Sequence, residues 1–193
     1  SHMGVYPAPS VKTSSDGNEA TSPVTAEVWA EHSIWTQDPQ FALALKGGVT
    51  TFHVLPGSAN LIGGRGVTAK NLQRNTINSM KIPDAPHSLK MACGENPKRV
   101  YGNRGQTPST RMGNIAGYRK SWIKAEGYLS RLDEYEAKSD EAKELSYKPT
   151  RDLELETLAG VLRGDILVHN HCYRADEMAM MIDVAKEFDY KIT

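Results

Sequence analysis

Three short segments of mostly apolar residues, separated by longer stretches with helical spacing, constrain the fold of this chain more than any other feature. They cover residues 49–55, 89–93 and 166–171, and Gly, Pro or polar residues bound them. Continuous apolar runs of this length are typical of strands that are buried on both faces. Strands that alternate with helices predict an α/β protein with about four parallel strands and surrounding helices.

Capping residues predict where the helices between these strands begin. Asp38-Pro39 begins the first helix, and Thr110 begins a long second helix that we expect to extend through the charged residues 133–148. Thr150 and Asp176 are predicted to cap two further helices. Strands and helices are therefore expected to alternate along most of the chain.

The remaining segments are rich in Gly, Pro and polar residues and are predicted to be loops. Residues 1–37 form the longest of them, with a short helical piece at 24–35, and residues 57–66 and 94–109 form two more. Residues 191–193 have the pattern of a further strand. We therefore expect residues 1–193 to be an internal piece of a larger domain.

Charge and hydropathy exclude several classes of partner. Lysine plus arginine and aspartate plus glutamate both number 23, so the formal net charge is zero. Without a basic or acidic run, binding to nucleic acid or to a membrane surface is disfavoured. No apolar run approaches the roughly 18 residues of a transmembrane helix. We expect a soluble protein, and the sequence leaves open whether it is cytoplasmic or exported.

The two cysteines, Cys93 and Cys172, do not belong to a CxxC pair, which disfavours a zinc ribbon or a redox motif. Two reduced thiols in the core are the preferred interpretation, and a disulfide is the alternative.

His169 and His171 carry the sharpest chemical signal in the sequence. They lie two residues apart at the carboxyl end of the third predicted strand, so the period of two places both on one face. Parallel α/β folds build their sites at this end of the strands, and imidazole is a preferred ligand of zinc. A metal site and a pair of hydrogen-bonded histidines are the two interpretations of this spacing.

Four blocks of the sequence resemble, in the same order, those of imidazolonepropionase-like amidohydrolases. In the last block the strand ends in histidine and is followed by Arg174-Ala175-Asp176-Glu177, similar to the Arg-Ala-Asp-Asp turn after the fifth strand of that family. The four blocks cover residues 47–51, 56–64, 90–99 and 164–178.

The resemblance implies that the chain is roughly the first half of a (β/α)8, or TIM, barrel with one or two divalent metal ions, expected to be zinc, at the carboxyl ends of its strands. It places His171 at the strand-five ligand position, with His169 as the second choice. The middle ligand is Glu95 or a carbamylated Lys90. Glu95 is preferred because it lies just past the strand end.

At the other ligand positions, this sequence departs from the pattern of the family. The His-x-His of strand one is expected immediately before Gly4, where Ser1-His2-Met3 stands. His2 is either the native second histidine or part of the remnant of a cleaved tag, and the tag is preferred. The strand-six His and the strand-eight Asp, which acts as general base in the family, are expected beyond Thr193. The resemblance therefore implies metal-assisted hydrolysis by the complete protein and no turnover by this piece alone.

Seven polar residues near the predicted strand ends and loops are candidates for binding a small amide-type substrate. Two arginines are suited to holding a carboxylate through paired hydrogen bonds, and two residues beside His171 are suited to supporting it. The seven are Ser58, Asn60, Arg65, Asn96, Arg111, Tyr173 and Arg174.

Two functions follow from these observations. The first is a hydrolase that cleaves C–N bonds in amides, cyclic amides or peptide-like substrates. The second is a non-catalytic α/β module that binds a small molecule or a partner. Because a cut barrel exposes strand edges, we expect either a homo-oligomer or pairing with the missing half of the barrel.

Overall fold

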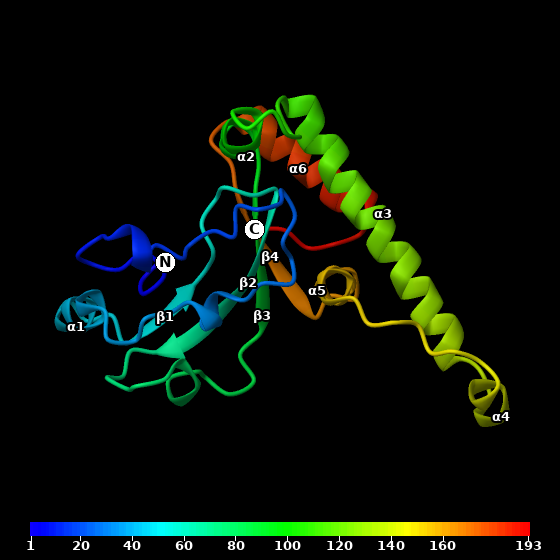
Figure 1. Ribbon diagram of the computed structural model, residues 1–193, viewed down its shortest axis with the longest axis horizontal. Coiled ribbons are helices and arrows are strands. Elements are labelled where there is room, and N and C mark those ends of the chain that lie inside the picture. Colours follow the sequence, from blue (N-terminus) through cyan, green and yellow to red (C-terminus); the bar gives the residue numbers. More distant parts are fainter.

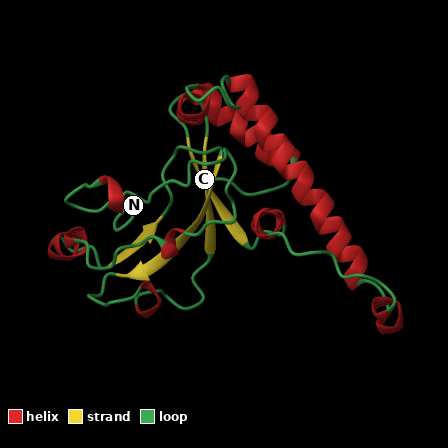
Figure 2. Cartoon of the chain, viewed as in Figure 1, coloured by secondary structure: helices red, strands yellow, loops and turns green.

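The computed structural model describes residues 1–193 as an α/β arrangement around one mixed sheet. The sheet has four strands in the order of the chain, and Figure 2 shows helices packed around it. The strands are β1 (Thr51–Val54), β2 (Ile62–Lys70), β3 (His87–Ala92) and β4 (Ile166–His171). The α/β class and the three predicted strands are therefore confirmed.

The expectation of an all-parallel sheet is wrong for two of the three strand pairings. Only β3 and β4 pair in parallel, whereas β2 is antiparallel to both β1 and β3. Because β2 runs against both of its neighbours, β1, β3 and β4 all point the same way. Their carboxyl ends therefore lie at the same end of the sheet.

Strand β2 was missed because its glycines were taken as loop residues. A Cβ on Gly66 would lie 2.5 Å from Ser88 Oγ on β3, and one on Gly64, where φ is +113°, would collide with the Val28 carbonyl. These glycines therefore allow β3 and the segment around Val28 to approach β2 closely, and they do not form a turn.

Six α-helices and three short 3-10 helices complete the chain. The predicted cap at Asp38 is confirmed, because its side chain accepts a hydrogen bond from Gln40 N (2.9 Å). The predicted start of the long helix near Thr110 is also confirmed, and the Thr110 side chain accepts from Gly113 N (3.0 Å). The α-helices are α1 (Pro39–Lys46), α2 (Glu95–Gly102), α3 (Arg111–Glu136), α4 (Asp140–Glu144), α5 (Leu153–Leu162) and α6 (Ala175–Glu187). The 3-10 helices are η1 (Lys12–Ser14), η2 (Ala30–His32) and η3 (Ile77–Ser79).

Several predicted helix boundaries were wrong. The long helix ends at Glu136, and Ser139 caps the separate helix α4 by accepting a hydrogen bond from Ala142 N. Asp152, not Thr150, caps α5, and Arg174, not Asp176, occupies the N-cap position of α6. Ser139 and Asp152 satisfy free N–H groups of their helix starts through their side chains, whereas at the start of α6 the Glu177 side chain accepts from Arg174 N.

Two of the predicted loops also differ. Residues 94–109 contain helix α2, which was missed because it has few apolar residues and includes Asn96, Pro97 and Gly102, residue types that are typical of loops. Residues 24–35 contain only the 3-10 helix η2 in place of the predicted helical piece.

Helices α3, α5 and α6 cover one face of β3 and β4 (Figure 1). The core beneath them contains Tyr118 and Trp122 of α3, both fully buried, together with Leu89 of β3 and Val168 of β4. A smaller core joins β1 and β2 to α1 through Phe41 and its neighbours. No helix combines the length and apolar character needed to cross a membrane.

The opposite face of the sheet carries polar side chains. Since side chains alternate along a strand, Leu89 and Met91 point toward the helices while Ser88 and Lys90 belong to the other face. The same alternation in β4 places His169 and His171 on that polar face. The residues on which the predicted chemistry depends are therefore segregated from the apolar core.

Both ends of the chain extend the sheet. Ser1 N donates to His53 O (2.7 Å) and Leu55 N donates to Ser1 O (3.1 Å), so residues 1–2 lie beside the carboxyl end of β1. At the other edge Ile192 forms a parallel bridge with Val168 of β4. This bridge agrees with the strand pattern predicted at 191–193.

Cys93 and Cys172 form a disulfide, so the preferred expectation of two reduced thiols was wrong. Each cysteine directly follows the end of one of the two parallel strands β3 and β4, and their Cα atoms are 5.2 Å apart. The parallel pairing therefore brings together two residues that are separated by 79 positions in the sequence.

Candidate functional site

The candidate site lies where β1, β3 and β4 reach their carboxyl ends, on the polar face of the sheet. His2 lies beside the end of β1, Lys90 projects from β3, and His169 and His171 project from β4. Lys90 lies opposite His169 in the register, and Ala92 lies opposite His171. Four of the five predicted metal ligands are thus placed on neighbouring elements of one sheet.

The side chain of His2 is fixed by the backbone of the segment after β1. Its Nδ1 lies 2.8 Å from Leu55 O, and because a carbonyl only accepts, Nδ1 carries the hydrogen and Nε2 keeps its lone pair. Partial desolvation lowers the pKa of His2, the hydrogen bond to Leu55 opposes this shift, and the charge of Lys90 adds to it. A neutral imidazole with a free Nε2 is the form of histidine that binds a metal.

Lys90 is the most deeply buried cation on the polar face, with 7% of its surface exposed. No carboxylate of the protein forms an ion pair with it. Burial lowers the pKa of Lys90, because the charged form loses hydration without compensation. The neutral amine is the nucleophilic form of a lysine, so this environment favours covalent chemistry at Nζ.

His171 lies against two partners, Asn96 and Tyr173, and these three residues form the mouth of the site. Asn96 Nδ2 is 3.4 Å from His171 Nε2 and 3.4 Å from Tyr173 Oη, and the rings of His171 and Tyr173 meet edge to face at 4.4 Å. Desolvation lowers the pKa of His171, and the charge of Lys90 lowers it further, while Glu177 and Glu95 act in the opposite direction. His171 is therefore held as a neutral imidazole close to Asn96 and Tyr173.

His169 belongs to a second layer deeper on the same face. Its Nδ1 is 3.0 Å from Thr193 Oγ1, and its ring lies 5.3 Å from that of His53 on β1. His53 in turn makes 2.8 Å hydrogen bonds to Thr68 and Ser88. Sequence analysis did not single out His53, because an isolated histidine inside a strand gives no sign of what faces it.

Glu95 lies apart from the buried centre of the site. It is exposed as the first residue of α2, and no hydrogen bond or ion pair ties its carboxylate to the other predicted ligands. Its charge nevertheless acts on His171, so the two residues lie near one another. Of the two predicted middle ligands, Lys90 is the buried one, and it lies opposite His169 in the register of β3 and β4.

The predicted substrate-binding residues divide into two groups. Asn96 and Tyr173 lie against His171 at the mouth. Arg65 lies elsewhere, with its guanidinium 4.4 Å from the centre of the Trp29 ring and its Nε donating to Thr157 Oγ1 of α5 at 2.9 Å. Since α5 covers the apolar face, Arg65 is directed away from the polar face.

The remaining candidates mostly make structural contacts. Arg111 donates to the buried carboxylate of Glu177 at 2.6 Å, and Arg174 pairs with Asp176 at 2.7 Å. The Asn60 amide donates to Thr25 Oγ1 at 2.7 Å and accepts from Tyr101 Oη at 2.8 Å. Ser58 is half-buried in the loop after β1.

A divalent metal fits part of this donor set. No cluster of three or more His, Cys, Asp or Glu side chains is arranged to hold a metal ion. His2 and His171 supply two imidazoles whose lowered pKa favours the neutral form, and the buried Lys90 has a lowered pKa that favours the amine. The residues therefore fit a metal if Lys90 contributes an oxygen ligand as its carbamate.

No protein-family model matches the chain. The chain is 35% identical over 207 residues to amidohydrolase tasK of Hapsidospora irregularis, an alignment that covers 100% of the chain and 21% of that protein. It is also similar to the crystal structure of an amidohydrolase from Thermotoga maritima MSB8, with a TM-score of 0.90, 40% identity, and coverage of 100% of this chain and 48% of that one. The chain thus spans about a fifth of one relative and about half of the other. These similarities support an amidohydrolase family for the chain.

Proposed function

We propose, from this amidohydrolase relationship, that the chain is the part of a metal-dependent hydrolase that supplies ligands from one side of a (β/α)8 barrel. The reaction proposed is hydrolysis of a C–N bond in an amide, cyclic amide or peptide-like small molecule, as in imidazolonepropionase-like enzymes. Because the chain covers less than half of either relative, the activity is proposed for the whole protein.

One observation carries the proposal. His2 from the edge of the sheet, Lys90 from β3 and His171 from β4 lie close enough for the charge of Lys90 to lower the pKa of both histidines. Three elements that are distant in sequence therefore converge at the carboxyl ends of parallel strands, where barrel enzymes place their chemistry.

The proposed ligands are His2, His171 and a carbamylated Lys90. His2 is taken as native in place of the tag remnant that the sequence favoured, because both similarities cover 100% of the chain. A zinc ion held there supplies Lewis-acid polarisation of the scissile carbonyl and activation of water. The Leu55 carbonyl orients His2, and burial lowers the pKa of Lys90, which favours the neutral amine that reacts with carbon dioxide. His169 is proposed as a neighbour in the layer below, and Glu95 is less favoured than Lys90 because it is exposed.

Asn96 and Tyr173 are the proposed substrate contacts. Both lie beside His171 at the mouth, and Asn96 presents an amide donor suited to a carbonyl or carboxylate oxygen. Arg65 and Arg111 are not included, because their guanidinium groups are already engaged with Trp29 and Thr157 or with Glu177. The proposal assigns no general base within residues 1–193.

Metal analysis and activity of the protein expressed from its full reading frame test the proposal. Zinc is expected to co-purify, and His171→Ala is expected to lower the zinc content and abolish hydrolysis across a panel of amides, lactams and dipeptides. His32→Ala is the matched control, because the side chain of His32 is 73% exposed and lies outside the site. Equal zinc content in His171→Ala and His32→Ala would refute the ligand assignment, and a metal-free protein with no hydrolysis would refute the function.

A further inference from the structure

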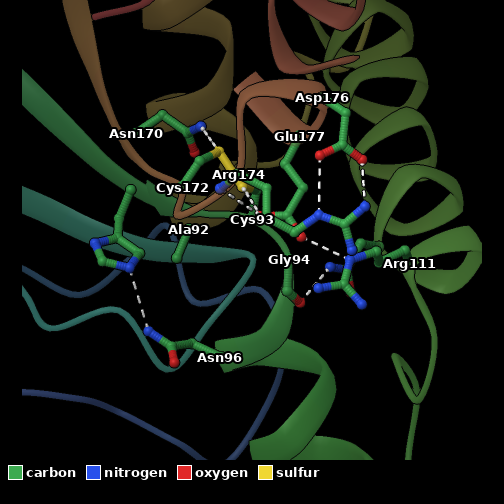
Figure 3. Close-up of a disulfide and its surroundings, with 12 residues drawn as sticks. Ala92, Cys93, Gly94, Asn96, Arg111, Asn170, Cys172, Arg174, Asp176 and Glu177 are labelled. Carbon is green, nitrogen blue, oxygen red and sulfur yellow. Dashed lines mark hydrogen bonds and ion pairs between the residues drawn. A yellow bond between two sulfur atoms is a disulfide. The ribbon is translucent and has the colours of Figure 1, made fainter. Parts of the chain in front are cut away.

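The disulfide lies immediately beside the candidate site. Cys93 follows the last residue of β3, and Cys172 follows His171 at the end of β4. Cys93 N also donates to His171 O at 2.8 Å, so the covalent and hydrogen-bonded links occur at the same junction (Figure 3). The disulfide therefore fixes the distance between the two chain segments that leave the parallel strands.

These two segments carry the residues that form the mouth. Asn96 lies three positions after Cys93, while His171 and Tyr173 flank Cys172. The side-chain contacts across the junction, from Asn96 to His171 and to Tyr173, are both 3.4 Å long. Hydrogen bonds of that length are weak, so they hold the segments together less firmly than the covalent bond does.

A separate set of contacts keeps the same region folded without the disulfide. The buried Glu177 accepts from Arg111 Nε at 2.6 Å and from Arg174 N at 3.3 Å, and Asn114 Nδ2 donates to Gly94 O at 2.8 Å. Figure 3 shows Glu177 beside the disulfide and Arg111 paired with Glu177. Opening the disulfide is therefore expected to loosen the mouth while α2, α3 and α6 remain in place.

A small reductant has access to one of the two sulfur atoms. Cys93 is only 3% exposed, whereas Cys172 lines a cavity of about 530 Å³ together with Asn170 and Met178. Attack therefore occurs at Cys172 Sγ. The thiolate of a dithiol bonds to that sulfur, Cys93 leaves as a thiolate and takes up a proton, and the second thiol of the reductant then releases Cys172. The two cysteines gain two electrons and two protons, and the dithiol becomes a cyclic disulfide.

We propose that the Cys93–Cys172 disulfide is a redox-controlled brace of the candidate site, closed in the oxidised protein and released by dithiols. In the oxidised form it holds Asn96 against His171 and Tyr173. In the reduced form the segments 94–96 and 171–174 separate and the mouth loses its fixed geometry. The effect on metal binding rests on the proposed function, whereas the effect on the mobility of these segments does not.

Hydrogen exchange measured by mass spectrometry on the whole protein tests the brace directly. Adding excess dithiothreitol is expected to raise exchange in residues 94–96 and 171–174 by about tenfold, as local opening becomes less costly, and to leave the rest of α2 and α6 unchanged. Peptides that cover β1 are the internal control and should not change. The double variant Cys93→Ala/Cys172→Ala should exchange like the reduced protein and should not respond to dithiothreitol.

Zinc affinity, measured with Zn²⁺ alone, separates this proposal from the proposed function. The double variant, which has no thiols at this position to bind zinc, is expected to bind Zn²⁺ about tenfold more weakly than the oxidised protein, as when supporting contacts of a ligand are lost. Unchanged exchange after reduction, or free thiols in protein purified without reductant, would overturn the brace whether or not Zn²⁺ binds. Redox-dependent exchange without any Zn²⁺ binding would support the brace and contradict the proposed metal site.

Discussion

Lys90 and His169 lie directly opposite one another in the parallel register of β3 and β4. The lysine is buried and lacks an acidic partner, and its charge also lowers the pKa of His169, although desolvation of that histidine has the larger effect. Two groups that are cationic when protonated thus face each other on the polar side of the sheet. Such an arrangement costs stability and is typical of functional sites.

Replacing Lys90 is therefore expected to stabilise the protein and to abolish metal binding. Burial of this lysine without an acidic partner destabilises the folded state, so at pH 7 Lys90→Met should raise the free energy of unfolding by roughly 1 kcal/mol. Because the folded-state pKa of Lys90 is lowered, wild-type stability should rise as the pH increases through that pKa, and the advantage of the variant should shrink. Urea denaturation at pH 7 and 9.5 measures both effects, and a variant less stable than wild type at pH 7 would contradict them.

Glu95 provides the comparison that decides which residue is the middle ligand. Glu95→Gln keeps the size of an exposed side chain, so we expect unchanged stability and unchanged zinc content. Lys90→Met should lose zinc under the same conditions. The reverse result, with zinc lost only from Glu95→Gln, would restore the assignment that the sequence alone favoured.

The ion pair between Arg111 and Glu177 is expected to be structural. The Glu177 side chain is 2% exposed, and Arg111→Met leaves its carboxylate buried without a cation. Removing one partner of a fully buried pair costs about 3–5 kcal/mol, and because the arginine is 32% exposed we expect roughly 2 kcal/mol here. Chemical denaturation of Arg111→Met and of Arg111→Met/Glu177→Met measures the cost. The double variant should recover most of the lost stability, and a raised substrate KM with unchanged stability would instead support a substrate role for Arg111.

Local sequence features predicted much of the fold but not its long-range pairings. The caps at Asp38 and Thr110 and the limits of β4 could be predicted because each depends on residues within a few positions. Strand β2 could not, because Gly66 is required by the proximity of Ser88, which lies 22 positions further along the chain.

In the candidate site, too, local sequence signals could be recognised and contacts between distant residues could not. His169 and His171 could be found from their spacing at a strand end, which is a local signal. The roles of Arg65 and Arg111 could not, because Thr157 and Glu177, which occupy their guanidinium groups, are distant in sequence. The partnership of Cys93 with Cys172 likewise appears only once β3 and β4 are known to be parallel neighbours.

His53 is expected to make the free energy of unfolding depend on pH. Burial, followed by the nearby charge of His169, lowers the pKa of His53 to about 4, while an unfolded histidine titrates near 6.5. Below pH 6.5 the unfolded chain therefore binds a proton that the folded protein refuses, so this contribution to stability is present above pH 6.5 and is lost as the pH falls toward 4. If the whole pKa difference acted, the free energy of unfolding would fall by about 1.4 kcal/mol for each pH unit between 6.5 and 4. Because the ring is partly exposed to solvent, the fall should be below about 1 kcal/mol per pH unit.

Comparison of His53→Gln with wild type isolates this contribution from those of the other histidines. Glutamine retains hydrogen-bonding groups for Thr68 and Ser88 but does not titrate. The difference in unfolding free energy between the two proteins should therefore shift in favour of the variant between pH 6.5 and 4 and become constant below that range. His32→Gln, at an exposed position, should show no such shift. An NMR titration in which His53 gains its proton near pH 6.5 would show that the ring is not held neutral by its surroundings, and the pH-dependent difference should then be absent as well.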